Sequence, residues 1–340
     1  MATKKVTSLE VAKLAGVSQS AVSRVFTPGA SASKKTGEKV RKAAMELGYR
    51  PNVLARSLIT GRSRIIGLVV ANLDNYFYPE ALELISNALQ KKGYHVLVFM
   101  ASKTAGSIDD VVDEILDYQV DGIILASVAM SSSLASRCTS AGVPVILFNR
   151  SQDDDSFSAI TSDNILGGQK VARFLIAGGH KRIGYIAGWE GASTQRDRET
   201  GFVEELKQHG MSLHAREVGN FIQDEARQAA RKMFTANEIP DAVFVASDHM
   251  AFAVMDVLRS EIGLKIPEQV SVVGYDDVPV SSWPAYDLTT IRQPANRMVA
   301  ETVSMILESI ENKKTTPRQI KIDGPLIMRG STRMSTKLSK

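Results

Sequence analysis

Residues 7–26 read TSLEVAKLAGVSQSAVSRVF, and this stretch decides how the N-terminal part of the chain folds. Thr7 and Glu10 have the spacing of a capping box, in which each side chain hydrogen-bonds the backbone of the other residue at the start of a helix. That first helix is expected to run to about Ala15. The side chains expected to face inward are Leu9, Val11 and Ala12.

A tight turn leads into a second helix. Gly16 suits the turn because glycine adopts positive φ without strain, and Ser18 is a favourable N-cap for a helix that reaches about Phe26. The apolar residues recur at helical spacing and form the inner face, which consists of Ala21, Val22, Val25 and Phe26. The outer face consists of Gln19, Ser20, Ser23 and Arg24. This face carries no acid, and Gln and Arg can each form two hydrogen bonds to a base, so it suits the major groove of DNA.

A third helix completes an all-α headpiece over residues 1–50. It is expected from about Lys34 to Leu47 and ends at Gly48, since glycine readily takes the left-handed conformation that follows a helix. The inner face is formed by Val40, Ala43, Ala44 and Leu47. The basic side chains that could lie along DNA phosphates are Lys34, Lys35, Lys39, Arg41 and Lys42.

The charge of the chain is unevenly distributed. Residues 1–64 carry a formal charge of +10 and the rest carries −6, although the whole chain is only +4. A basic module on an acidic body favours a polyanion as the partner of the first part alone. Charge by itself is equally compatible with a solvated basic surface, so the residue pattern has to decide.

The first fifty residues resemble the headpiece of the LacI–GalR family of bacterial transcription regulators. The shared segments, in the family's order and spacing, are Val6-Thr7, Val11-Ala12, Ala15-Gly16-Val17-Ser18, Val22-Ser23-Arg24-Val25 and Leu47-Gly48-Tyr49-Arg50-Pro51-Asn52. The resemblance implies a helix-turn-helix, with DNA contacts from Thr7, Ser18, Gln19, Ser20, Ser23 and Arg24. A generic three-helix bundle is the alternative, and it does not account for a match in so many parts.

Residues 51–63 are interpreted as a hinge helix and a linker. Pro51 suits the start of a helix, but so short a helix is marginal in water by itself. By the same resemblance, the hinge orders when two copies pack together on DNA, and it contributes contacts from Asn52, Ala55 and Leu58. Leu58 is then the wedge that enters the minor groove. A plain linker is the alternative.

From Ile65 onwards the β and α patterns alternate, which predicts parallel sheets covered by helices. The expected strands of a first series are Ile65–Val70, Val96–Phe99, Gly122–Leu125 and Val145–Phe148. Those of a second series are Ile183–Ala187, Ala242–Ala246 and Val270–Tyr275. Helices are expected at Pro79–Lys92, Ile165–Ala177, Glu199–Gln208 and Asp248–Arg259. Two such series predict two α/β lobes, each with a parallel sheet, and a cleft between them.

The family resemblance extends through about Met328 and implies a periplasmic-binding-protein-like effector domain over residues 64–340. The segments expected to cross between the lobes are Thr289–Arg292 and Gln319–Ile322. The N-lobe is then expected at about 64–161 and 292–322, and the C-lobe at about 162–290 and 323–330.

In open α/β sheets, ligands bind beyond the carboxyl ends of the strands, where this sequence places polar and aromatic residues. The aromatic rings could stack on a sugar or a base, or could be core residues at a helix entry. Arg198, three residues before Gly201, matches the family's ligand-binding arginine, and its guanidinium offers a planar fork of donors. The residues expected to bind an effector are Asn75, Phe77, Tyr78, Asn149, Arg198, Phe221, Ser247, Asp248, Asp276 and Gln293. Asp277 is expected to be structural.

No catalytic or metal-binding pattern is found in the sequence. The five histidines lack metal-ligand spacing, the glycine-rich segments lack phosphate-loop or dinucleotide spacing, and no serine or cysteine lies in a nucleophile elbow. The single cysteine excludes an internal disulfide. Neither an apolar signal core nor a run of roughly 18 apolar residues is present. We therefore expect a cytoplasmic protein that is not an enzyme, holds no cofactor and does not enter a membrane.

These patterns together predict a homodimeric regulator, most often a repressor in this family, that reads a palindromic operator and responds to a small effector. No heptad pattern follows Met328, which favours a dimer over a higher oligomer. The expected effector is a sugar, a sugar acid or a derivative, with a nucleobase or nucleoside less favoured; the choice between inducer and corepressor stays open. A binding protein for sugar uptake would share the body of the chain, but it would need a signal peptide and no basic headpiece.

Overall fold

The structure, a computed structural model, describes residues 6–27, 30–50, 62–71, 73–101, 106–128, 132–152, 156–312 and 316–333. The chain separates into two compact units at the junction between Ser63 and Arg64. The first unit contains the headpiece, and the second, the body, contains two parallel-sheet lobes. Each unit is described by itself.

The headpiece consists of three helices, as expected. They are α1 (Ser8–Ala15), α2 (Gln19–Phe26) and α3 (Lys34–Leu47). The predicted capping box is present, because the backbone N–H of Thr7 donates to the Glu10 carboxylate at 2.7 Å and the backbone N–H of Glu10 donates to Thr7 Oγ1 at 3.4 Å. Gly16 and Gly48 end α1 and α3 with φ angles of 66° and 65°, the left-handed region that favours glycine.

The inner faces of the three helices meet in one small core. Its buried residues are Val11, Ala12, Ala15, Val22, Val40, Ala43 and Ala44. The expectation that Leu9 faces inward is wrong, since its side chain is 62% exposed. Val11, Ala12 and Ala15 already occupy the inner face of α1, and the helical period turns Leu9 away from it.

The body contains two six-stranded sheets. The N-lobe sheet has the order β11-β5-β4-β3-β1-β2, and all its neighbouring strands are parallel. Its strands are β1 (Ile65–Val70), β2 (His95–Met100), β3 (Gly122–Ala126), β4 (Val145–Phe148), β5 (Ser158–Ser162) and β11 (Gln319–Ile322). The C-lobe sheet has the order β12-β10-β9-β8-β6-β7, and it is parallel except where β12 pairs with β10. Its strands are β6 (Ile183–Ala187), β7 (Ala215–Val218), β8 (Ala242–Val245), β9 (Ser271–Asp276), β10 (Thr289–Arg292) and β12 (Leu326–Ile327).

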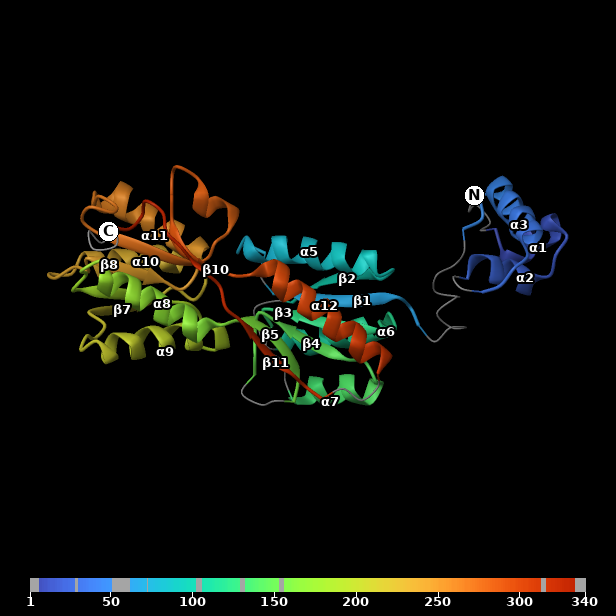
Figure 1. The fold of residues 1–340 in the computed structure, drawn as a ribbon, viewed down its shortest axis with the longest axis horizontal. Helices are drawn as coiled ribbons and strands as arrows, with labels where there is room; N and C mark the ends of the chain where they lie inside the picture. The colour runs from blue at the N-terminus through green and yellow to red at the C-terminus, as the bar shows by residue number, and fades with distance from the viewer. Residues whose placement is uncertain are drawn as a thin grey trace. The chain divides into compact units, whose positions relative to one another are not determined.

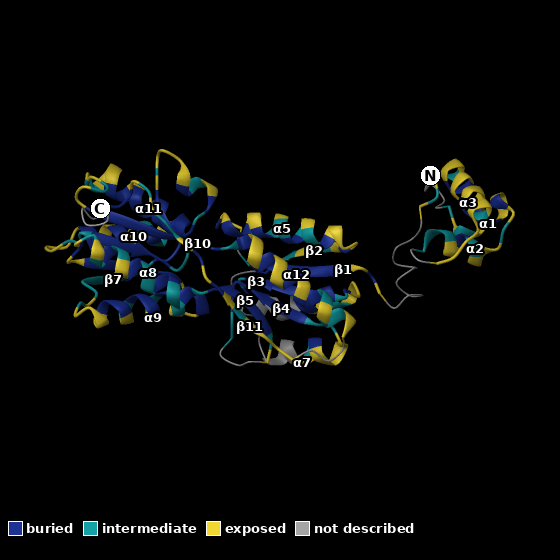
Figure 2. Cartoon of the chain, in the orientation of Figure 1, coloured by how far each residue is buried: buried dark blue, intermediate teal, exposed yellow. Residues whose placement is uncertain are grey.

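Helices cover both faces of each sheet (Figure 1). The N-lobe helices are α5 (Phe77–Lys91), α6 (Gly106–Asp117), α7 (Ser132–Ala141) and α12 (Ala295–Glu311). The C-lobe carries α8 (Asn164–Ala177), α9 (Ser193–Gln208), α10 (Gln223–Phe234), α11 (Asp248–Asp256), a π-helical turn (Val257–Ile262) and a 3₁₀ turn (Pro279–Ser282). Figure 2 shows the central strands of both sheets buried beneath these helices. Within the described residues, no helix combines the length and the apolar character needed to cross a membrane.

The chain passes between the two sheets three times, after β5, β10 and β11. The expectation that Thr289–Arg292 and Gln319–Ile322 themselves cross is therefore corrected. Both are strands that pair in register within a single sheet, and the residues that follow them make the crossing.

Three helices differ from the sequence expectation by two residues or more at one end. Helix α5 begins at Phe77, so Pro79 lies in its first turn. Backbone N–H groups of the first turn have no hydrogen-bond partner within the helix, so proline, which lacks an N–H, is tolerated there. Helix α9 begins at Ser193, so Arg198 lies within it. The helix expected through Arg259 changes to a π-helical turn at Val257.

Two glycines allow α8 and α9 to cross at backbone contact. A Cβ added at Gly201 would lie 2.0 Å from the carbonyl oxygen of Ile165, and one added at Gly168 would lie 2.2 Å from the carbonyl oxygen of Arg198. Any larger residue at either position therefore forces the helices apart. This crossing also determines where α9 places Arg198 in the body.

Gly201→Ala is expected to destabilise the body. Overpacking of this kind costs about 1–3 kcal/mol, which corresponds to a fall in melting temperature of roughly 2–4 °C per kcal/mol in a domain of this size. Differential scanning calorimetry on the full chain measures the change. Glu204→Ala, on the exposed side of the same helix, is the matched control and should melt with the parent protein. An unchanged melting temperature for Gly201→Ala would contradict the close crossing.

Candidate DNA-binding face and effector site

The polar face of α2 is exposed, as a base-reading surface requires. Gln19, Ser20, Ser23 and Arg24 are all exposed, whereas Val22 on the opposite side is buried in the headpiece core. Ser18 caps the helix, with its Oγ accepting from the backbone N–H of Ala21 at 3.2 Å. Packing of one side of α2 therefore leaves the other side free to face a groove of DNA.

One side chain of this face is already oriented by its neighbours. Gln19 Nε2 donates to Ser8 Oγ at 2.9 Å, from α2 to the start of α1. Thr7, which is also exposed, lies at the same end of α1. The three predicted hinge contacts, Asn52, Ala55 and Leu58, lie outside the described residues.

Arg198 occupies the interior of the body and not its surface, since its residue is 2% exposed. Its Nε donates to Asn164 Oδ1 at 2.8 Å, and Nη1 donates to the carbonyl oxygen of Ala246 at 2.5 Å. Its Cζ lies 3.6 Å from the centre of the Tyr275 ring, so the guanidinium plane is held by the ring. Its Nη2 faces Asp276 Oδ1 at 3.7 Å.

Asp276 joins three parts of the body. Asn75 Nδ2 of the N-lobe donates to Oδ2 at 3.0 Å, and Gln293 Nε2, just after β10, donates to Oδ1 at 2.7 Å. Burial raises the pKa of Asp276, while the nearby Arg198 opposes that rise. Asp276 also has a φ of 131°, and such strain at a non-glycine residue is typical of functional sites.

The carboxylate of Asp248 accepts hydrogen bonds from three groups of the protein itself. Its Oδ2 accepts from Ser281 Oγ at 2.6 Å and from the backbone N–H of Val278 at 3.1 Å, and its Oδ1 accepts from Thr290 Oγ1 at 2.6 Å. Burial, together with the Asp276 carboxylate, raises the pKa of Asp248 to about 7. Asp248 thereby holds the loop after β9 against β10.

On the N-lobe side, Asn149 lies close to the aromatic residues Phe77 and Tyr78. Asn149 Nδ2 donates to the Tyr78 hydroxyl at 3.1 Å, while Asn149 Oδ1 has no hydrogen-bond partner among the described residues. Phe77 stacks on Phe148 with ring centres 6.2 Å apart and meets Tyr78 edge-on at 5.4 Å. Both rings therefore pack against other aromatic side chains, and Phe77 also lines the cavity described below.

Two further predicted residues lie on the C-lobe side. Ser247 is wholly buried, and its Oγ has no hydrogen-bond partner among the described residues. The Phe221 carbonyl oxygen lies 3.0 Å from His249 Nε2, and a Cβ added at Gly188 would lie 2.2 Å from the Phe221 ring. Gly188 therefore makes room for this ring beyond the end of β6.

Arg150 is a residue that the sequence analysis passed over in favour of its neighbour Asn149. It is the second residue after the end of β4 and is 8% exposed. Its Nη2 lies 3.4 Å from Ser127 Oγ, and its Cζ lies 5.4 Å from the centre of the Trp189 ring of the C-lobe. Its position two residues beyond a strand end was a signal that could have identified it.

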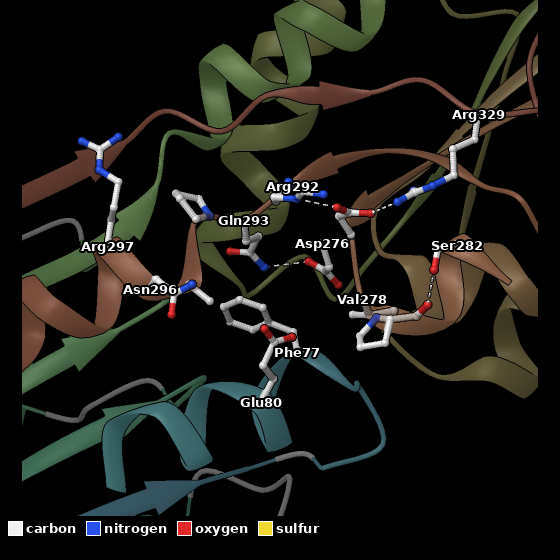
Figure 3. Close-up of a pocket in the computed structure, with 14 residues that line it drawn as sticks. Phe77, Glu80, Asp276, Val278, Ser282, Arg292, Gln293, Asn296, Arg297 and Arg329 are labelled. Carbon is white, nitrogen blue, oxygen red and sulfur yellow. Dashed lines mark hydrogen bonds and ion pairs between the residues drawn. The ribbon is translucent and has the colours of Figure 1, made fainter. Parts of the chain in front are cut away.

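A cavity of about 580 Å³ adjoins this region. Figure 3 shows Phe77 and Glu80 entering from α5, opposite the Gln293–Asp276 pair. Its remaining lining residues are Asp277, Val278, Pro279, Ser282, Arg292, Pro294, Ala295, Asn296, Arg297 and Arg329. Asp277 binds Arg292 Nε and Arg329 Nη2, each at 2.6 Å, a structural role that agrees with the sequence expectation. Three of the ten predicted effector residues line this cavity: Phe77, Asp276 and Gln293.

The other predicted effector residues lie around the facing ends of the two sheets. In the part of the chain that the structure describes, no group of three His, Cys, Asp or Glu side chains is placed to hold a metal ion. Asn164 and Tyr275, which hold Arg198, were also absent from the sequence expectation. Asn164 follows β5, whose sequence SAITS alternates small and polar residues and was not expected to be a strand.

Comparison with known families gives two matches. Residues 8–52 match the family described as bacterial regulatory proteins, lacI family. Residues 172–332 match the periplasmic binding protein-like domain. The first match covers the three headpiece helices, and the second covers most of the C-lobe.

Whole-chain relatives agree with these matches. The chain is 32% identical over 330 residues to the transcriptional regulator CelR of Thermobifida fusca, covering 94% of this chain and 96% of that protein. It is 30% identical over 327 residues to the transcriptional repressor PurR of Vibrio vulnificus strain CMCP6, covering 95% and 98%.

Solved structures agree as well. A Lac repressor dimer bound to operator and the anti-inducer ONPF has a TM-score of 0.88 at 28% identity, covering 97% of this chain and 99% of that chain. A CelR–cellobiose complex has a TM-score of 0.73 at 30% identity, covering 96% and 100%.

Arg24→Ala is expected to cost about 1–3 kcal/mol of discrimination between DNA sequences, the value of one bidentate base contact. A gel-shift titration with a selected duplex and its single-base variants measures this loss. Lys39→Ala, an exposed basic residue of α3, is the matched control and should weaken binding to every duplex equally. If the Arg24 variant discriminates between the duplexes as well as the parent protein does, Arg24 makes no specific base contact.

Proposed function

The chain belongs to the LacI family of bacterial regulatory proteins, and we propose that it is a transcriptional repressor whose operator affinity is controlled by a small sugar-like effector bound between the lobes. One observation carries this proposal. A single chain joins an exposed, acid-free recognition helix to a body in which Asp276 is hydrogen-bonded from both Asn75 of the N-lobe and Gln293 of the crossing segment.

The DNA-binding half of the proposal rests on α2. Two headpieces of a homodimer read a palindromic operator, with the half-site spacing set by the two-fold symmetry. Gln19, Ser20 and Arg24 select bases, while the basic residues of α3 contact phosphates, so that affinity falls steeply with salt. Thr7, Ser18, Ser23 and the hinge residues Asn52, Ala55 and Leu58 complete the proposed contacts. Bacterial operators lie in the cytoplasm, and we place the protein there.

The effector half rests on polar groups at the facing ends of the two sheets. Asn149 Oδ1 and Ser247 Oγ are hydrogen-bonding atoms without partners in the described residues, and ligand hydroxyl groups suit both. The CelR–cellobiose complex among the structural relatives supports a sugar. A nucleobase is less well supported, because one face of the Phe77 ring, which could stack on it, already packs on Phe148.

Effector binding is proposed to act on DNA through the relative position of the lobes. The N-lobe contacts the C-lobe through Asn75 and Asp276 and through the Ser151 backbone N–H, which donates to Ser193 Oγ at 3.0 Å. The N-lobe sheet begins at Ile65, directly after the hinge. A ligand that prefers one arrangement of the lobes therefore shifts the hinge with it, and only that preference produces a response.

Arg198→Ala is expected to leave operator binding intact and to abolish the response to the effector, because the substitution removes the guanidinium that faces Asp276. The effector is first selected by a thermal-shift screen of sugars, sugar acids and nucleosides, since bound ligand raises apparent stability. Gel shifts with and without that compound then compare the parent with Arg198→Ala and with Lys207→Ala, an exposed position of α9.

A normal dose response from the Arg198 variant would place the effector elsewhere. A parent protein that prefers no duplex over random DNA would overturn the proposed function itself.

A further inference from the structure

Trp189 is a large aromatic residue that remains half exposed at the boundary between the lobes. It is the second residue after the end of β6 and is 47% exposed. The Cζ atom of Arg150, in the N-lobe, lies 5.4 Å from the centre of its ring. A single exposed aromatic residue is ordinary on a protein surface. The surroundings of Trp189 therefore decide whether it binds a ligand.

The loop that carries Trp189 is anchored on both of its sides. The backbone N–H of Ala192 donates to the carbonyl oxygen of Trp189 at 3.0 Å, which closes a tight turn. On the side facing β7, Glu190 Oε1 accepts from Arg216 Nη2 at 2.7 Å. Because the loop is already ordered, a ligand that contacts the indole orders little more of the chain when it binds.

A glycine determines how the indole lies. A Cβ added at Gly191 would be 2.3 Å from Cζ2 of Trp189, so the ring lies directly against the backbone at Gly191. Arg196 Nη1 donates to the carbonyl oxygen of Gly191 at 3.2 Å and holds the backbone at this point. The indole is therefore oriented before any ligand arrives, although much of its surface faces solvent.

Trp189 stands at the outer end of a row of rings that begins beside buried polar groups. His249, two residues after Ser247, is 1% exposed and stacks on Phe221 with ring centres 6.5 Å apart. The Phe221 ring in turn lies against Gly188, the residue before Trp189, where an added Cβ would be 2.2 Å from the ring. Exposure rises along this row, from buried His249 through half-buried Phe221 to exposed Trp189.

Such a row suits a ligand that is longer than one sugar ring. A pyranose presents C–H groups on its face and hydroxyl groups on its edge, so its face can stack on an aromatic ring while polar side chains meet its edge. Glu190 and Arg196 are exposed on either side of Gly191 and offer an acceptor and donors for such edge hydroxyl groups. The half-exposed end of the row therefore has the chemistry of a sugar-binding surface of its own.

We infer that Trp189 forms an outer subsite for a second sugar ring, so that the effector is a disaccharide or a longer oligosaccharide and not a monosaccharide. The inference rests on the proposed function and narrows it. The hydroxyl groups of the inner ring meet Asn149 Oδ1 and Ser247 Oγ. The outer ring stacks on the indole and removes apolar surface of both partners from water.

The test uses the purified full-length protein and matched ligand series: glucose with cellobiose and maltose, galactose with lactose and melibiose, and xylose with xylobiose. Isothermal titration measures each affinity. We expect at least one disaccharide to bind on the order of 10- to 100-fold more tightly than its component monosaccharides, the usual effect of burying one large apolar side chain.

Variants locate the preference. Trp189→Ala should reduce affinity for the disaccharide to about that of the monosaccharide and leave monosaccharide affinity unchanged. Trp189→Phe, which keeps a flat ring, should restore part of the preference, whereas Gly191→Ala, which keeps the indole but displaces it, should lose part of it. Trp283→Phe is the matched control and should keep the preference, because Trp283 is the other tryptophan of the chain and is 56% exposed.

Fluorescence tests the stacking itself. In Trp283→Phe, Trp189 is the single tryptophan, so its emission reports on the proposed subsite alone. Saturating disaccharide should protect this emission from quenching by acrylamide, because the outer ring covers the indole. The component monosaccharide, which occupies the inner position, should leave the quenching unchanged.

The outcomes separate the two claims. If a monosaccharide binds as tightly as its disaccharides and changes operator affinity, the proposed function stands and the inference is wrong. If a disaccharide is preferred but Trp189→Ala keeps that preference, or Trp189 stays open to acrylamide, the second ring binds elsewhere and the inference is likewise wrong. If no compound of the series binds or alters operator affinity, the sugar-like effector of the proposed function fails together with the inference.

Discussion

The Asp276 carboxylate is the constraint on which the body of this protein depends. It stands at the end of β9 and receives hydrogen bonds from Asn75 of the N-lobe and Gln293 of the crossing segment, with Arg198 of α9 beside it. A buried carboxylate must be satisfied to remain charged. Because its donors come from both lobes and from the connection between them, any change in the arrangement of the lobes changes the environment of this one group.

The surrounding structure holds the partners of Asp276 in place. The glycine crossing of α8 and α9 places Arg198, and Asn164 and the Tyr275 ring then orient its guanidinium. Asp248 supports the loop after β9 through Ser281 and Thr290. A ligand that enters between the lobes therefore meets side chains that are already oriented, and the differential stability of two lobe arrangements is what it can alter.

The local features of the headpiece could be predicted from the sequence, because caps and turns depend on residues a few positions apart: Thr7, Glu10, Gly16 and Ser18 all behave as expected. Leu9 was misassigned because the inner face of a helix this short is decided by what packs on it. Strand β5 was not expected, because its residues are mostly small or polar and do not form the apolar run that is typical of a buried strand. The contact between Arg150 of the N-lobe and Trp189 of the C-lobe joins residues far apart in sequence, which no local pattern reveals.

We infer that the junction at Asp276 carries the state of the effector site to the DNA-binding unit. Fluorescence anisotropy with labelled operator measures the operator dissociation constant at zero and saturating concentrations of the sugar derivative selected by thermal shift, for the parent and for Asn75→Ala. In the parent protein, the two dissociation constants are expected to differ on the order of 5- to 150-fold, as is usual for allosteric coupling. In Asn75→Ala, which loses the N-lobe donor to Asp276, the ratio of the two constants should be much nearer to one. An equal ratio in the two proteins would contradict a role for Asp276 in the coupling.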